Sequence, residues 1–256
     1  MQRSKIIGIN FSANRRRGNR FVLYVLAVLA FVPIASSLHA SDKNLSFILR
    51  GTYTTSSRIF GNPDASTEEQ RAQFSQLDGI TGGGITLRYR WPGEQFFFTL
   101  SVDLLSQVQE RNQFLSFSPS RRLPVTEGLR LVPVEIGMHT YIPIGSESMR
   151  LSMGGGIGMY AGERILRVAG VEAAMQNNPV RFGIHVSSGV EYRVLPGVWL
   201  HGEMKFRDPE FRAVSRFTQE RTVFEGTTIT FPQNEFSSRV NVNGMAFSFG
   251  VAVELL

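Results

Sequence analysis

Apolar and polar side chains alternate one by one along much of the chain beyond residue 44, and this period of two restricts the fold more than any other feature. Successive side chains of a strand point to opposite faces, so the alternation predicts strands with one apolar and one polar face. Many of the stretches approach the roughly 9–11 residues of a tilted membrane strand. Eight stretches show the pattern: 45–54, 85–91, 96–104, 132–139, 149–159, 180–192, 198–207 and 244–255.

The connections between these stretches are alternately short and long. Short turns are expected at Trp91–Glu94, Pro143–Ser148 and Leu195–Gly197, and long polar connections at 55–81, 106–128, 162–179 and 208–239. Membrane barrels have this layout because their periplasmic turns are short and their outer loops long. The sequence therefore predicts an all-β fold: an eight-stranded antiparallel up-and-down transmembrane β-barrel with four long outer loops. In the last loop, residues 221–231 have the pattern of a hairpin.

The first 40 residues have the layout of a secretory signal peptide. A basic segment that includes Arg15, Arg16, Arg17 and Arg20 precedes the apolar run 21–32, and small residues follow before Ala40. The apolar run is shorter than the roughly 20 residues of a membrane-spanning helix. We therefore expect a cleaved signal peptide at 1–40 and a barrel domain at 41–256, with an uncleaved N-terminal anchor as the alternative.

The net charge of +6 belongs to the leader. Six of the 27 basic residues lie in residues 1–40, which leaves 21 basic against 21 acidic residues in the remainder. A chain without a basic excess has no general attraction to phosphate, so nucleic-acid binding is not expected. The sequence has no cysteine and therefore offers neither disulfides nor thiolate metal sites.

The polar faces of the expected strands carry many charged residues. In lipid these faces turn inward, and an eight-stranded interior is just wide enough for side chains to fill it. A soluble sandwich with the same charges in water is the alternative. We expect a filled interior with a polar network made of Arg50, Arg88, Arg90, Glu135, Arg150, His185, Glu191, His201 and Glu203.

Two details of this interior can be predicted. If Pro196 is the centre of its turn, Glu191 lies opposite His201 and Ser187 opposite Lys205. The glycines at 154, 156 and 158 leave a bare wall, and the arginines at 50, 88 and 90 are expected to extend toward it.

Three segments resemble the small outer-membrane β-barrels of the OmpX/OmpW type: LSMGGGIGMYAG at 151–162, FGIHVSSGVEYRVLPGVWLHGEMKFR at 182–207 and AFSFGVAVELL at 246–256. The resemblance covers residues 44–256. It implies that the last segment is a barrel-insertion signal, carried by Ser248, Gly250, Val253 and Leu255. Such signals usually end in an aromatic residue, whereas this chain ends in Leu256.

Catalytic and metal chemistry have little support in the sequence. The three histidines of the mature chain lack the spacing of metal ligands, so neither a metal nor another cofactor is expected. His185 and Ser187 resemble the His-x-Ser of outer-membrane lipid A deacylases, with Glu191 or Glu203 as the orienting acid. The residues around them do not match that family, so the chain is expected not to be an enzyme.

We therefore expect a non-enzymatic outer-membrane barrel with a structural role or a binding role of its loops. A narrow channel for small apolar solutes and a lipid-modifying enzyme are the alternatives. The expected partners are outer-membrane lipid and lipopolysaccharide, and the barrel-assembly machinery and periplasmic chaperones during biogenesis. The barrel is expected to be a monomer.

Overall fold

A computed structural model of the protein describes residues 44–115 and 117–255. The expected signal peptide at 1–40 lies outside these residues. The elements are β1 (Leu45–Phe60), α2 (Glu68–Ala72), β2 (Phe74–Arg90), β3 (Phe96–Leu115), β4 (Ser118–Ser146), β5 (Met149–Val168), β6 (Val171–Met175), β7 (Val180–Leu195), β8 (Val198–Arg207), β9 (Glu210–Phe217), β10 (Arg221–Phe224), β11 (Thr227–Thr230), β12 (Phe236–Asn241) and β13 (Met245–Glu254).

The described residues form an all-β fold of thirteen strands, five more than the eight alternating stretches. The eight alternating stretches lie in β1, β2, β3, β4, β5, β7, β8 and β13. The other five strands lie in two stretches that were expected to be long loops. One of these loops, residues 208–239, contains the hairpin expected at 221–231, which is formed by β10 and β11.

The long strands also extend farther than expected. Most of the expected loop 106–128 is strand, because β3 continues to Leu115 and β4 begins at Ser118. This part of β4 alternates as well: Leu123, Val125 and Leu129 are buried, whereas Arg122 and Arg130 are exposed. Its apolar face is covered by the protein itself, which explains why the segment is strand and not loop.

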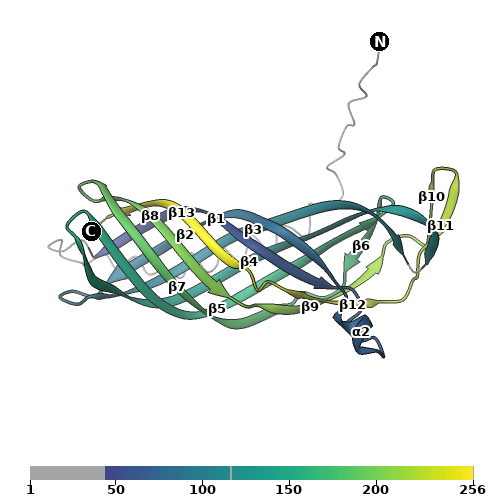
Figure 1. The fold of residues 1–256 in the computed structure, drawn as a ribbon, viewed down its shortest axis with the longest axis horizontal. Helices are drawn as coiled ribbons and strands as arrows, with labels where there is room; N and C mark the ends of the chain where they lie inside the picture. The colour runs from purple at the N-terminus through teal and green to yellow at the C-terminus, as the bar shows by residue number, and fades with distance from the viewer. Residues whose placement is uncertain (1–43, 116, 256) are drawn as a thin grey trace, which may run out of the picture. The chain divides into compact units, whose positions relative to one another are not determined.

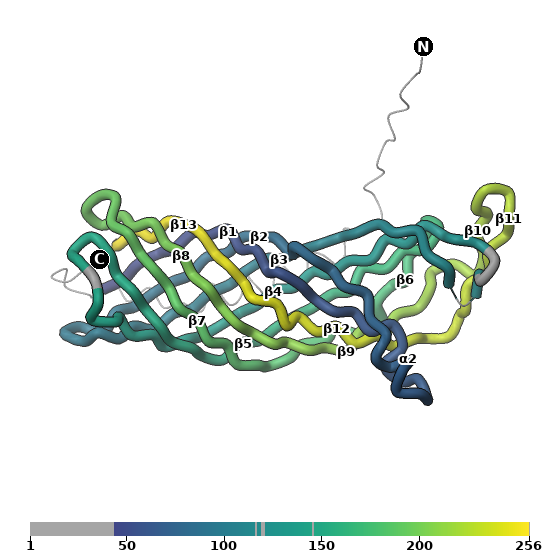
Figure 2. Tube along the Cα trace, in the orientation of Figure 1, coloured from purple at the N-terminus to yellow at the C-terminus, as the bar shows by residue number. Residues whose placement is uncertain are grey.

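Eleven of the thirteen strands belong to one antiparallel sheet. Its order is β12-β9-β6-β5-β4-β3-β2-β1-β13-β8-β7, with additional pairings of β12 with β1 and of β5 with β7. The strands run obliquely to the long axis of the sheet (Figure 2). The end of the chain and the β10–β11 hairpin lie at opposite ends of this sheet (Figure 1).

The three expected short turns are confirmed. β2 and β3 are separated by residues 91–95, β4 and β5 by residues 147–148, and β7 and β8 by residues 196–197. Gly93 and Gly197 have φ angles of 75° and 78°, a conformation that glycine adopts without the steric cost of a Cβ.

Among the described residues, no helix has the length and hydrophobicity that a membrane crossing requires. The helix α2 has five residues, and its N-cap Thr67 accepts a hydrogen bond from the backbone N–H of Gln70.

Buried apolar residues form three clusters. A small one contains Ile48, Trp199 and Ala252. A second contains Ile59, Leu77, Ile80, Leu105, Leu129, Leu131, Tyr160, Phe211, Val240 and Val242. The third is built around Leu123, Val125, Leu166, Val168, Phe217 and Phe231, and so lies toward the β6 and β10–β11 end. Between the first and second clusters the sheet encloses charged side chains, and these form the candidate site.

Candidate functional site

Glu135 is the centre of one part of the buried charged network. Its carboxylate accepts hydrogen bonds from Lys205 Nζ at 2.8 Å, Arg207 Nη1 at 3.2 Å and Tyr160 Oη at 3.0 Å. Glu135 is on β4, Tyr160 on β5 and the two cations on β8, and β4 and β8 are not neighbours in the sheet. Glu135 is 1% exposed, so these contacts replace water for the carboxylate.

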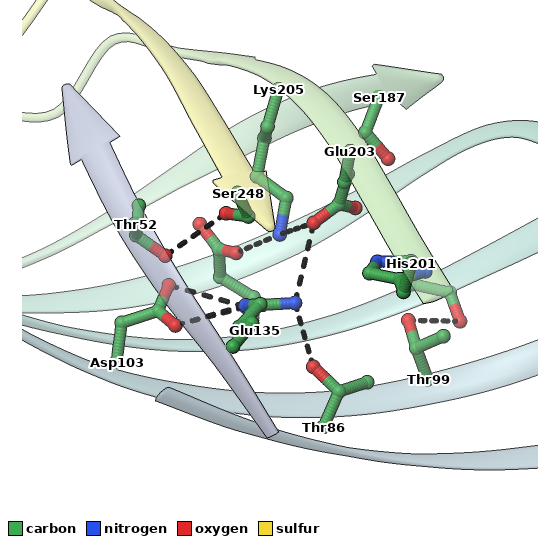
Figure 3. A network of polar contacts seen from close by, with 12 residues as sticks. Thr52, Thr86, Thr99, Asp103, Glu135, Ser187, His201, Glu203, Lys205 and Ser248 are labelled. Atoms are coloured by element: carbon green, nitrogen blue, oxygen red, sulfur yellow. Dashed lines mark hydrogen bonds and ion pairs between the residues drawn. The ribbon is translucent and has the colours of Figure 1, made fainter. Parts of the chain in front are cut away.

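Arg50 on β1 is the centre of a second part, and its partners Thr86, Asp103 and Glu203 are labelled in Figure 3. Its guanidinium donates to Asp103 Oδ1 from Nη2 at 3.0 Å, and to Thr86 Oγ1 and Glu203 Oε2 from Nη1 at 2.7 and 3.2 Å. Lys205 Nζ lies 3.5 Å from Glu203 Oε2, and Arg207 Nη1 lies 3.5 Å from Asp103 Oδ2. The Arg50 part and the Glu135 part are therefore one network.

A third part joins Arg88, Glu191 and His201. Arg88 donates to both oxygens of Glu191, at 3.0 and 2.5 Å, and also to Tyr141 Oη at 3.2 Å. His201 Nδ1 lies 3.0 Å from Glu191 Oε1. The predicted register is confirmed, because Glu191 pairs with His201 and Ser187 with Lys205 across β7 and β8.

The charges of this network balance. Arg50, Arg88, Lys205 and Arg207 are the cations, and Asp103, Glu135, Glu191 and Glu203 are the carboxylates. Every one of these carboxylates has a cation within 3.5 Å. Paired, hydrogen-bonded charges of this kind are what a low-dielectric interior tolerates.

The remaining two arginines of the expected network lie nearer the short turns. Arg150 donates to Glu254 Oε1 at 3.0 Å and lies 3.7 Å from the centroid of a Trp199 ring. Arg90 is half-buried at the end of β2.

The space beside Gly154 and Gly158 is filled by Tyr160 and His139, whereas arginines were expected there. A Cβ at Gly158 would lie 2.7 Å from Tyr160 Oη, and one at Gly154 would lie 2.6 Å from His139 Cδ2. The guanidinium of Arg50 bonds to Asp103, Thr86 and Glu203 instead. The expectation that Arg50 fills this gap was wrong, because its carboxylate partners hold it elsewhere.

Replacing Gly156 by alanine is expected to lower the free energy of unfolding by about 1–3 kcal/mol, the usual cost of overpacking. The new Cβ would lie 2.0 Å from the carbonyl oxygen of Ile136 and 2.6 Å from Gly137 Cα, and both are backbone atoms. Gly83→Ala is the matched control, because its nearest atom is 3.4 Å away. Urea titration of the folded protein in detergent measures both variants; equal effects would contradict the expected contact.

Ser187 hydrogen-bonds to a different histidine from the one its sequence suggests. Its Oγ lies 3.0 Å from Nε2 of His139, whereas no hydrogen bond joins it to His185 within the described residues. The other ring nitrogen of His139 has no partner there, so no acid orients this imidazole. A serine nucleophile needs such an orienting group on its base.

His139 and His201 nevertheless approach each other more than their strands suggest. β4 and β8 do not pair, but both side chains line one small interior cavity. Within residues 44–115 and 117–255, no group of three or more His, Asp or Glu is arranged to hold a metal ion. The sequence did not signal this convergence, because it depends on curvature across the sheet.

The residues of the expected insertion signal lie on β13 and just beyond it. Ser248 Oγ lies 2.9 Å from Thr52 Oγ1, and Gly250 pairs with Arg50 and His201 on its two neighbouring strands. Val253 is half-buried and Leu255 is exposed. Their role in assembly stays a prediction.

A scan of protein-family models and a search of the curated proteins each gave no match. Solved structures do match. The outer membrane protein OprG from Pseudomonas aeruginosa has a TM-score of 0.55 and 14% identity, over 83% of this chain and 97% of OprG. Neisserial surface protein A matches with a TM-score of 0.42 and 12% identity, over 82% of this chain and 97% of its own. Ail, the attachment invasion locus protein of Yersinia pestis, matches with a TM-score of 0.39 and 12% identity, over 81% and 98%.

The expected resemblance to small outer-membrane β-barrel proteins is confirmed at the level of the fold. At 14% identity the likeness to OprG concerns the fold alone.

Proposed function

We propose that the chain is a non-enzymatic outer-membrane protein whose strands β1, β2, β3, β4, β5, β7, β8 and β13 form a closed eight-stranded barrel. Each of these strands pairs with two others of the set, and the β5–β7 pairing completes the circuit. Closure leaves no strand edge, which a sheet in hydrocarbon requires. The likeness to OprG supports this fold.

The observation that carries the proposal is a reversal of polarity along single strands. On β4, the outward Ile136 and Met138 are exposed while the alternate residues Glu135 and His139 are buried. Nearer the start of the same strand, Arg130 is exposed while Leu129 and Leu131 are buried. The strand thus has a charged inner face and an apolar outer face in one part, and the opposite in the other.

β5 reverses at the same level. Its outward residues Met153 and Ile157 are exposed and apolar, and they are followed by the exposed Glu163 and Arg167. Glu163 pairs with Arg130 on β4 in the register of the two strands. Lipid requires an apolar outer face, whereas water requires the reverse. The part of the barrel between the short turns and the level of Arg130 and Glu163 therefore spans the membrane. The part beyond Arg130 and Glu163 stands in water outside it.

The part of the sheet beyond Arg130 and Glu163 is the proposed binding or structural element. It contains the third apolar cluster and the β10–β11 hairpin, which Arg121 ties to β4 through Glu225 and Thr227. One buried ion pair, Arg164 with Glu127 at 2.6 Å, lies within it. Membrane lipid and lipopolysaccharide would contact the apolar belt, and a partner would contact the outer loops.

Single introduced cysteines can test where the membrane boundary lies on the barrel. The chain has no cysteine of its own, so no other thiol would react. In intact cells, a membrane-impermeant maleimide is expected to label Glu163→Cys and not Met153→Cys. Both side chains face outward and are exposed, so a soluble protein would label at both positions. Equal labelling would overturn the proposal. If heating the purified protein did not change its mobility on a gel, the barrel would be contradicted.

The narrow channel is the second candidate, and the second apolar cluster disfavours it. Ten buried residues from the inner faces, including Leu129, Tyr160 and Phe211, fill the interior beyond the charged network. We expect the protein to produce no single-channel conductance in planar bilayers, because apolar packing excludes hydrated ions. Reproducible conductance steps would contradict a filled interior.

The lipid-modifying enzyme rests on Ser187 alone. Its His139 partner lacks an orienting acid, and Ser187 is 8% exposed inside the sheet. Mass analysis of lipid A from cells with the natural chain and with Ser187→Ala is expected to give the same species. A lipid A species that depends on Ser187 would restore this alternative.

A further inference from the structure

A small cavity lies among the side chains of the charged network. Its volume is about 20 Å³, and the residues that line it include Arg88, His139, Ser187, Gly189, His201 and Glu203. A water molecule needs about 10–15 Å³ of such space and two to four polar partners. The cavity therefore has room for one water and is too small for an organic ligand.

Three polar atoms of the lining side chains have no hydrogen-bond partner among the described residues: Arg88 Nε, His139 Nδ1 and His201 Nε2. Their side chains are more than nine-tenths buried. An unsatisfied buried polar atom costs about 1–3 kcal/mol, and all three atoms belong to side chains that line one cavity, which points to a shared partner inside it.

The other contacts of these side chains determine what that partner must offer. Arg88 Nε can only donate. His201 donates from Nδ1 to the Glu191 carboxylate, and in the tautomer that carries its proton on Nδ1 the Nε2 atom is an acceptor. His139 likewise becomes an acceptor at Nδ1 when its Nε2–H donates to Ser187 Oγ. One donor and two acceptors match a molecule that accepts one hydrogen bond and donates two.

The charge around the cavity favours a neutral molecule. The Arg88 guanidinium is already paired with both oxygens of Glu191, and Glu203 is paired with Arg50 and Lys205. An anion would meet no unpaired cation here, and a metal ion would lie beside the Arg88 guanidinium. Both would disturb a balance that is complete without them.

We propose that one ordered water occupies this cavity, accepting from Arg88 Nε–H and donating to His139 Nδ1 and His201 Nε2. The water joins the Arg88–Glu191–His201 group to the His139–Ser187 pair, and so connects β2, β4, β7 and β8 through the interior. It also holds His139 and His201 in fixed and opposite tautomers.

Nitrogen-15 NMR of the histidine rings, recorded on the complete mature protein in detergent micelles, tests this proposal. We expect the ring proton on Nδ1 of His201 and on Nε2 of His139, and magnetisation transfer from one slow water to both rings. His185 is an internal comparison, because its Nδ1 also lacks a partner but it does not line the cavity. The other tautomer at either ring, or no water contact, would overturn the assignment.

Gly189→Ala is the matched intervention. Its Cβ would enter the lining 2.9 Å from Ser152 Oγ and 3.9 Å from His201 Cε1. We expect the water contacts to be lost and the two acceptor nitrogens to shift toward the values of unbonded ring nitrogens. Gly51→Ala is the control, since its nearest atom is 3.9 Å away. A shift of the ring signals of the natural chain on adding chloride or zinc would identify an ion and refute the water.

Discussion

Replacing Glu135 by glutamine is expected to lower the free energy of unfolding by about 3–5 kcal/mol, the usual cost of breaking one partner out of a buried ion-pair network. Glutamine keeps the shape of the side chain and removes its charge. Lys205 and Arg207 would then lose the carboxylate that lies 2.8 and 3.2 Å from them. Asp103 and Glu203 would remain as their partners, at 3.5 Å, so the interior would carry one uncompensated positive charge.

Glu163→Gln is the control for this experiment. Glu163 also pairs with an arginine, Arg130, at 3.5 Å, but both side chains are more than half exposed. An exposed pair contributes about 0–1 kcal/mol, so this variant should unfold almost like the natural chain. Urea titrations in the same detergent, followed by the folded-to-unfolded gel shift, compare the two.

A double variant separates charge from packing. Adding Lys205→Met to Glu135→Gln removes the excess cation, and we expect part of the lost stability to return, because the remaining cations and carboxylates again balance. If Glu135→Gln and Glu163→Gln cost the same, or if the double variant is additive, the interior charges do not act as one network.

Replacing Ile157 by arginine is expected to cost about 2–4 kcal/mol and to reduce the amount of folded barrel in the membrane. This is the range measured for arginine on the lipid face of a membrane barrel near the midplane. Ile157 is 65% exposed, and it lies between Met153 and Met159 on the outward face of β5. A side chain so exposed would accept arginine at almost no cost in water.

Ile165→Arg is the matched control, because it places the same residue on the same strand and the same face. Ile165 is half-buried and lies on this face between Glu163 and Arg167, which are both charged and exposed. We expect a change within about 0.5 kcal/mol, as for most surface substitutions. Folding yields into lipid vesicles, together with urea titrations, measure both variants. A similar effect at 157 and 165 would argue against a membrane boundary between them.

The sequence predicted the local features of this fold well. Period-two alternation identified the eight long strands, and the turn residues located their three short connections. Counting outward from Pro196 placed Glu191 opposite His201, since two strands joined by a tight turn leave little freedom of register. Of the five additional strands, β10 and β11 form the hairpin expected at 221–231, whereas β6, β9 and β12 were missed because they lie in stretches without a long apolar alternation.

The candidate site was only half visible in the sequence. The inward-facing residues of single strands could be identified, and Arg50, Arg88, Glu135, Glu191 and His201 are indeed buried. Their partners could not be identified from the sequence, because Arg50 bonds to Glu203 and Arg88 to Glu191 across more than 100 residues of chain. The same limit applies to Ser187, whose partner is His139 on a strand that does not pair with its own.

By itself, the sequence therefore determined which residues share a face of a strand and where neighbouring strands turn back. Both follow from the geometry of a chain in which side chains alternate and tight turns fix the register. Only the tertiary structure decided which charges meet across the interior, and at Arg130 and Glu163 where the apolar face changes sides. Alternation records that two faces differ, whereas the curvature of the whole sheet decides which of them is enclosed.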